Sequence, residues 1–148
     1  MSALTHDLIV VGAGPTGMAA ALKAASLGLR TLLLDENNGP GGQIYRNVMN
    51  VPPRVASVLG ADYLHGRRLA QRLADSTAQV QHNTLVWDVA PDLTVTALHE
   101  GVSQQWRAPQ LIAATGALER ASPLPGWTRP GVMNAGAAQI ALKAGGLI

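Results

Sequence analysis

Residues 7–35, DLIVVGAGPTGMAAALKAASLGLRTLLLD, decide the fold, because they form one complete strand, loop, helix and strand unit. The unbroken apolar run 8–11 is typical of a parallel strand that is covered on both faces. The alanine-rich segment 15–27 predicts a helix that is apolar nearly all round and should be buried, with Gly28 as its left-handed cap. The run 29–34 predicts the second strand. The unit therefore predicts an α/β fold with a parallel sheet.

The loop of this unit has the spacing GxGxxG, and each glycine has a different expected role. Gly12 allows a tight turn, Gly14 allows the backbone to approach a pyrophosphate, and Gly17 allows the helix to pack closely on the strand. Pro15 suits the first helical turn, where its missing N–H costs nothing. Thr16 is either a hydroxyl donor to the pyrophosphate or an ordinary early-helix residue, and its place in the motif favours the first. The motif predicts a Rossmann-like dinucleotide site.

An acidic pair follows the second strand and supplies the next candidate contact. Asp35 lies 18 positions after Gly17, close to the spacing of about 20 for the acid that hydrogen-bonds an adenosine ribose. Glu36, next to it, is included in the candidate site. A 2′-phosphate would meet a carboxylate here, so FAD or NAD is favoured over NADP. The alternative is a glycine-rich turn in an ordinary α/β unit, but the predicted strand and helix around the motif favour nucleotide binding.

Composition limits the possible partners and chemistries. The 148 residues are enough for one domain, 1–148, that buries about 70% of its unfolded surface. The net charge is only +2 and no basic run exceeds the pair Arg67-Arg68, which argues against nucleic acid. Cysteine is absent, so this chain has no disulfide, no CxxC redox pair and no cysteine nucleophile. The absence of a signal-like segment or a long apolar run predicts a cytoplasmic protein without a membrane span.

The remaining polar residues give little support to a metal site or a hydrolase. The four histidines are scattered without HxxxH or HExxH spacing, so no metal is expected. The nucleophile elbow GxSxG is missing as well. No residue stands out as a catalytic base, and the catalytic residues are left open.

The chain after residue 35 reads as a series of shorter elements. We expect an irregular connection over 44–53, where Pro52-Pro53 should break any regular element, and an amphipathic helix within 61–74 with a solvated basic face. Short alternating runs over about 80–107 predict a small antiparallel meander. The run 111–114 can then join the parallel sheet. A loop and a last helix over about 135–143, ended by Gly145-Gly146, complete the crossover segment of about 117–148.

Several of these segments together resemble the two-dinucleotide-domain flavoprotein oxidoreductases, the superfamily of glutathione and thioredoxin reductases. The first motif and its acid match the FAD pyrophosphate and ribose motif. Gly41-Gly42-Gln43 matches the glycine pair and glutamine that lie along the flavin in thioredoxin reductase-like members. On composition alone, this loop is as easily an ordinary surface loop. Ala114-Thr115-Gly116 resembles the second family motif, where the chain passes near FAD; Thr115 is also an ordinary strand-end residue.

A closer resemblance involves three segments, DENNGPGGQIYR, DYLHGRRL and the long stretch 114–143. They are similar to the alpha subunits of opine oxidase, hydrogen cyanide synthase and the D-hydroxyproline or proline dehydrogenases. The resemblance implies an FAD-dependent oxidoreductase that oxidises the carbon–nitrogen bond of an amine or amino acid. It also implies that the partner is a second flavoprotein subunit. Tyr45 and Arg46, which follow the glycine pair, are either contacts of the flavin or substrate or a packing tyrosine and a surface arginine, and the second interpretation is favoured.

Two departures from the superfamily pattern limit these expectations. Thiol–disulfide exchange needs a thiolate, so disulfide reductase activity is rejected for this chain. Full-length members also have a further nucleotide domain and a C-terminal return, which predicts that these residues are an N-terminal portion whose missing parts lie in the same polypeptide or in another chain. The alternatives left open are a non-catalytic cofactor-binding or electron-transfer module that acts only within a complex, and an NAD-binding domain.

Overall fold

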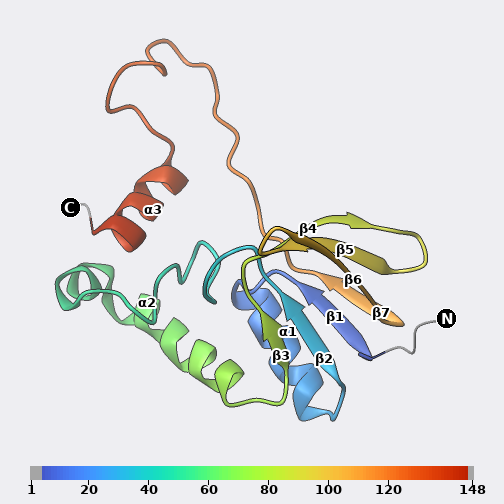
Figure 1. Cartoon of the computed structure of the whole chain (residues 1–148). Coiled ribbons are helices and arrows are strands. Elements are labelled where there is room, and N and C mark those ends of the chain that lie inside the picture. Colours follow the sequence, from blue (N-terminus) through green and yellow to red (C-terminus); the bar gives the residue numbers. More distant parts are fainter. Residues whose placement is uncertain (1–4, 147–148) are drawn as a thin grey trace.

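The computed structural model describes residues 5–146, and the ends of the expected domain 1–148 and crossover 117–148 lie outside the described residues. Four parallel strands form a sheet in the order β3-β2-β1-β7 (Figure 1). The strands are β1 (Leu8–Val11), β2 (Thr31–Leu34), β3 (Gln79–Gln81) and β7 (Gln110–Ala113). Helix α1 (Pro15–Ser26) connects β1 to β2. The prediction of an α/β Rossmann-like fold is confirmed.

The two faces of this sheet have different coverings. On one face, the side chains of Leu8, Val10 and Leu33 pack with α1 and with the later helix α2 (Pro53–Ala74). On the other face, Ile9, Leu32 and Leu34 pack with residues of the meander and its exit. Because both faces are covered, β1 is apolar throughout and β2 is apolar after Thr31.

The meander is a separate antiparallel sheet of three strands, β4 (Thr84–Val89), β5 (Thr94–His99) and β6 (Val102–Arg107). A register shift between Val86 and Asp88 marks a bulge in the β4–β5 pair. The expected start of the meander at Val80 is wrong, because Val80 belongs to β3 and pairs in parallel with Leu33. A three-residue strand is too short to show whether its partner runs parallel or antiparallel.

The second helix begins earlier than expected. Residues 42–50 are turns, as predicted for an irregular connection, but Pro53 opens α2 instead of interrupting it. Proline at the first position of a helix loses no hydrogen bond. Gly60 interrupts the helical geometry with φ 79° and ψ −176°, so α2 is two helical pieces joined at a kink. The basic face is exposed at Arg68 and Arg72, as expected.

Helix α1 is buried on one side only, contrary to the expectation from its composition. Met18, Ala21 and Ala24 face the core, whereas Ala19 and Lys23 are exposed. Alanine adds little apolar area, so an alanine-rich helix does not need to be covered all round. The chain leaves α1 through a left-handed Gly28 at φ 81°, as predicted.

After β7 the chain leaves the sheet and arches over to α3 (Ala135–Gly145), which lies beside the 44–50 turns and the beginning of α2 (Figure 1). Large apolar side chains are exposed along this arch, including Leu118 and Trp127. Gly146 ends α3 with φ 64°. Over residues 5–146, no helix is both long enough and apolar enough to cross a membrane.

Candidate functional site

The candidate site lies where all four parallel strands end. Gly12, Asp35, His82 and Ala114 each follow the last residue of a strand, so the topology brings them to one edge of the sheet. The chain proceeds from β1 to β2 and β3 on one side and returns to β7 on the other side of β1 (Figure 1). Ligands of open parallel sheets bind at such a switch point, beyond the carboxyl ends of the strands.

Backbone hydrogen bonds fasten this edge. The N–H of Gly12 donates to Leu34 O at 2.7 Å, and the N–H of Ala114 donates to Val11 O at 2.8 Å. The loop after Asp35 folds back, because the N–H of Gly41 donates to Ala13 O at 2.8 Å. The first motif, the 41–43 segment and the start of the second motif therefore lie together, in agreement with what the family resemblance implies.

Two glycines of the motif are required by packing within the protein. Gly12 has φ 103°, and a Cβ at this position would collide with the carbonyl of Ala114. A Cβ at Gly17 would collide with the carbonyl of Gly12. The expected roles of Gly12 in a turn and of Gly17 in close packing agree with this geometry.

Gly14 differs, because nothing in the chain requires a glycine there. Its φ of −69° and ψ of 178° are accessible to any residue, and a Cβ would meet only Gly42 Cα at 3.9 Å, an ordinary contact. On the opposite side, a Cβ on Gly42 would come within 2.8 Å of Gly14 Cα. The space in front of Gly14 is thus a cradle that a side chain would fill, which fits a closely approaching pyrophosphate.

The electrostatics of this cradle suit an anion. Gly14 is the N-cap of α1, Pro15 occupies the first turn, and that turn contains no acidic residue. The unpaired N–H groups at a helix start and the helix dipole favour negative charge. Thr16 is exposed at this end of α1, within reach of solvent and of a ligand.

Asp35 is 6% exposed and already holds the loop in place. Its Oδ2 accepts a hydrogen bond from the N–H of Ala13 at 2.5 Å, and its Oδ1 accepts one from the N–H of Asn37 at 2.8 Å. A carboxylate can accept about four hydrogen bonds, so a ribose hydroxyl remains compatible with this arrangement. The ribose contact stays a prediction. Glu36 is exposed beside it.

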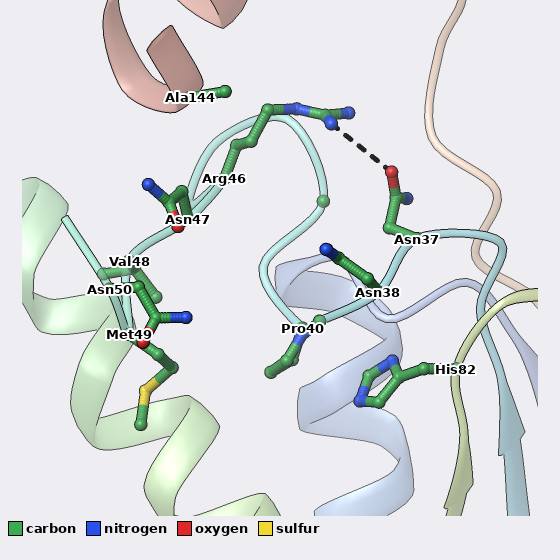
Figure 2. Close-up of a pocket in the computed structure, with 12 residues that line it drawn as sticks. Asn37, Asn38, Pro40, Arg46, Asn47, Val48, Met49, Asn50, His82 and Ala144 are labelled. Atoms are coloured by element: carbon green, nitrogen blue, oxygen red, sulfur yellow. Dashed lines mark hydrogen bonds between the residues drawn. The ribbon is translucent and has the colours of Figure 1, made fainter. Parts of the chain in front are cut away.

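A cavity of about 510 Å³ lies next to these residues, between the loop after β2, the turns after Gln43 and the end of β3 (Figure 2). Ligand pockets of proteins are commonly of this size. Arg46 and Asn37 approach one another at its rim, with Arg46 Nη1 3.4 Å from Asn37 Oδ1. Asn38, Pro40 and His82 form the other side.

Two buried nitrogen atoms of this cavity have no hydrogen-bond partner among the described residues. They are Arg46 Nε and His82 Nδ1. Buried polar atoms are almost always satisfied in native proteins, so both indicate a ligand or water that completes the site. The expectation that Arg46 is a surface arginine is therefore wrong: its side chain is half-buried at the cavity. The expectation for Tyr45 fits, since its ring packs against Gly66.

The sequence does not predict His82 as a site residue, and it favours a surface position for Arg46. Neither residue belongs to a sequence motif, and only the tertiary structure brings the two to the cavity. The only local signal was position, because His82 follows a strand of the parallel sheet. Of the remaining candidates, Gln43, Thr115 and Gly116 are exposed at the same edge, and their contacts with a cofactor stay predictions. No cluster of three potential metal-ligating His, Cys, Asp or Glu residues lies within 5–146.

The chain is similar to a known protein family. A family model described as pyridine nucleotide-disulphide oxidoreductase matches residues 6–143. The chain belongs to this oxidoreductase family. The expectations of an FAD-dependent oxidoreductase, and of FAD as cofactor, are thereby confirmed at the level of the family. The family description mentions disulphide chemistry, but the residues of this chain include no cysteine to perform it.

The curated relatives are subunits of enzymes. An opine oxidase subunit from Agrobacterium tumefaciens (strain Ach5) is 45% identical over 149 residues, which cover 95% of this chain and 30% of that protein. The HcnB component of hydrogen cyanide synthase from Pseudomonas protegens is 36% identical over 147 residues, covering 93% and 30%. The chain thus spans less than a third of the length of either relative. L-Proline dehydrogenase from P. horikoshii has the same fold, with a TM-score of 0.70 over 94% of this chain and 28% of that chain, at 19% identity.

Proposed function

We propose that this chain is the FAD-binding portion of an enzyme that oxidises the carbon–nitrogen bond of an amine or amino acid. The observation that carries the cofactor assignment is the room at Gly14, where a Cβ would meet only Gly42 Cα at 3.9 Å and the fold itself does not need a glycine. The helix start at Pro15 and Thr16 is proposed to hold the pyrophosphate through backbone N–H groups. Asp35 is proposed to accept a hydrogen bond from the ribose.

The cavity supplies the second part of the proposal. Arg46 and His82 present buried nitrogen atoms without partners among the described residues, in the cavity lined by the loop after Asp35, and we assign them to polar groups of the adenosine diphosphate moiety. Gly41, Gly42 and Gln43 border the cradle on its other side, and Ala114, Thr115 and Gly116 lie across the sheet edge. When bound, the flavin supplies the hydride-accepting chemistry, and the protein orients it.

The substrate class comes from the relatives. Opine oxidase and hydrogen cyanide synthase are joined by sarcosine oxidase, whose alpha subunit in Rhizobium meliloti (strain 1021) is 37% identical over 140 residues. We propose by similarity that the substrate is a small amine or amino acid and that the partner is a second flavoprotein subunit. A cytoplasmic location stays a prediction.

Replacing Gly14 with alanine tests the cofactor assignment, with Gly17→Ala as the matched control. The added methyl at Gly14 enters the cradle and makes only an ordinary contact with Gly42, so we expect an unchanged melting temperature and FAD affinity lower by at least about tenfold, or 1.4 kcal/mol. Gly17→Ala should instead lower the melting temperature, because its methyl collides with the Gly12 carbonyl. Full flavin retention by Gly14→Ala, measured by visible absorbance and titration, would contradict the assignment.

The second candidate is a non-catalytic cofactor-binding or electron-transfer module. Anaerobic addition of amines or amino acids to the flavin-loaded chain separates the two: bleaching of the flavin supports the oxidoreductase, and a yellow but inert protein supports the module. Binding of NAD without flavin would instead favour an NAD-binding domain.

A further inference from the structure

Lys143, in the last turn of α3, is a buried cation outside the proposed cofactor cradle. It is 8% exposed, and its Nζ donates hydrogen bonds to Gln139 Oε1 at 2.6 Å, Ile44 O at 2.9 Å and Gln43 O at 3.2 Å. The chain has one other lysine, Lys23, which is exposed on α1. A lysine is seldom buried unless its charge is paired.

This ammonium group is held by neutral acceptors. Among the described residues, the ion pairs are Arg30–Asp7 and Arg107–Asp92, and neither involves Lys143. Burial lowers the pKa of Lys143, and the nearby charge of Arg46 lowers it further. Burying a cation without a carboxylate costs free energy. The three hydrogen bonds of the buried ammonium group hold one specific stretch of backbone in place.

The anchored stretch borders the proposed cradle. Gly42 lies against Gly14 at the start of α1, and the next two carbonyls, of Gln43 and Ile44, point to Lys143. Because this peptide bond is trans and planar, the N–H of Ile44 points away from Lys143. That N–H has no acceptor among the described residues, so it is a donor held in a fixed direction.

Further contacts fasten α3 to the same segment. The side-chain nitrogen of Asn47 donates to Lys143 O at 3.2 Å, and Leu142 packs against the cluster of Val48 and Tyr63. The ammonium lies 5.8 Å from the centre of the Tyr63 ring, within the range of a cation–π contact. Tyr63 in turn donates its hydroxyl to Arg46 O at 2.7 Å. The end of α3 thus contacts residues 43–48, the segment that directly follows Gly42.

We propose that Lys143 is a positioning residue: it fixes the Gln43–Ile44 peptide so that the Ile44 N–H faces the bound cofactor, and it makes FAD binding depend on docking of α3. This inference rests on the proposed FAD site. Its consequence is reciprocal, because two events coupled through one segment must each favour the other to the same extent. FAD should therefore hold α3 in place, and loss of the lysine should weaken FAD binding.

The first experiment compares Lys143→Met and Lys143→Arg, with Lys23→Met as the matched control, in the full chain. Hydrogen exchange of the Tyr45 and Val48 amides, measured without cofactor, reports the anchor. FAD affinity and the visible circular dichroism of bound flavin report the site. We expect Lys143→Met to speed exchange, lower affinity about tenfold and alter the flavin spectrum. Lys143→Arg should restore part of each property, and Lys23→Met should change none.

The second experiment needs no substitution and so does not depend on a variant that folds. An amine-reactive reagent is applied to the native protein, and labelling of the two lysines is quantified by mass spectrometry. Lys143 should react far more slowly than Lys23, and saturating FAD should slow it at least about fivefold more, without an effect on Lys23.

Distinct results overturn the two proposals. If Lys143→Met speeds hydrogen exchange but leaves the FAD affinity and the flavin spectrum unchanged, the lysine is structural only. The same conclusion follows if FAD does not change the rate at which Lys143 is labelled. Wild-type protein that binds no FAD would refute the cofactor site itself, while the exchange experiment would still report whether Lys143 anchors residues 43–48.

Discussion

At the scale of single residues, Asp35 has a structural role, beside its proposed contact with the ribose, that its position in the sequence did not reveal. Its carboxylate holds the Ala13 and Asn37 N–H groups before any ligand arrives. An acid at the end of the second strand could be predicted from spacing, but its internal partners depend on how the loop folds back. The cofactor contact and the loop contact must therefore be separated by experiment.

Asp35→Ala should weaken FAD binding by about 1–3 kcal/mol, the scale of a lost charge-assisted hydrogen bond. Unlike Gly14→Ala, it should also destabilise the cofactor-free protein by about 1–3 kcal/mol, because buried N–H groups lose their acceptor. Titration calorimetry and thermal melts measure the two effects. A drop in stability with unchanged FAD affinity would leave Asp35 only its structural role.

A second residue-scale prediction concerns acid pH. Hydrogen bonds from the Arg30 side chain and then its backbone N–H lower the pKa of Asp7 from 3.8 to about 2. A lowered carboxylate pKa stabilises the fold above the unfolded pKa, and this contribution is lost as pH falls through the folded pKa. The stability difference between wild type and Asp7→Asn should hold near neutral pH and vanish between about pH 4 and 2.

Melting temperatures of the two proteins, compared at low salt over this range, measure the effect. Asp62→Asn, at an exposed position of α2, controls for removal of a negative charge. Because the pair is exposed, added salt should shrink the difference. A difference that persists unchanged at pH 2 would contradict the assignment to Asp7.

At the scale of elements, the kink of α2 is a feature that the sequence pattern does not predict. The apolar spacing after residue 61 indicated a helix, but the preceding piece needed Pro53 as a helix start and Gly60 as a break. Two prolines in a row predict an interruption, yet Pro52 is the N-cap and Pro53 the first residue of the helix. The sequence likewise places Val80 in the meander, because a strand of three residues does not indicate whether it pairs in parallel or antiparallel.

Gly60→Ala should destabilise the protein by about 1–3 kcal/mol, because φ 79° with ψ −176° is essentially restricted to glycine. No atom lies near the added methyl, so the cost is conformational only. Gly39→Ala is the matched control: its surroundings are also open and its φ is not positive, so the change should stay within about 0.5 kcal/mol. Equal effects in chemical denaturation would disprove the backbone explanation.

At the scale of the whole molecule, the stability is concentrated in the sheet and its two coverings, whereas the arch after β7 contributes little. Leu32 is fully buried between the sheet and the meander, and Leu118 is 94% exposed. Leu32→Ala should therefore cost about 2–5 kcal/mol, and Leu118→Ala should cost less than about 0.5 kcal/mol. Urea denaturation measures both, and a costly Leu118→Ala would show that the arch packs against something in solution.

Much of the parallel sheet and the first helix could be predicted, because covered strands and a glycine-rich turn are local patterns. The cavity could not, because Arg46 and His82 are far apart in sequence and line the same cavity only in the folded chain. Lys143 was equally invisible: a lysine near the end of a helix is normally solvated, and only the docking of α3 buries it.

The unequal duties of the three glycines have a consequence for tracing this motif in other chains. A protein that retains the equivalents of Gly12 and Gly17 but has a larger residue in place of Gly14 would keep its strand–helix contact and lose its room for a ligand. Pattern searches that weight the three positions equally would still count it as a nucleotide binder. Under the proposed role of Gly14, only the residue at the middle position distinguishes a chain that keeps the fold from one that also keeps room for the ligand.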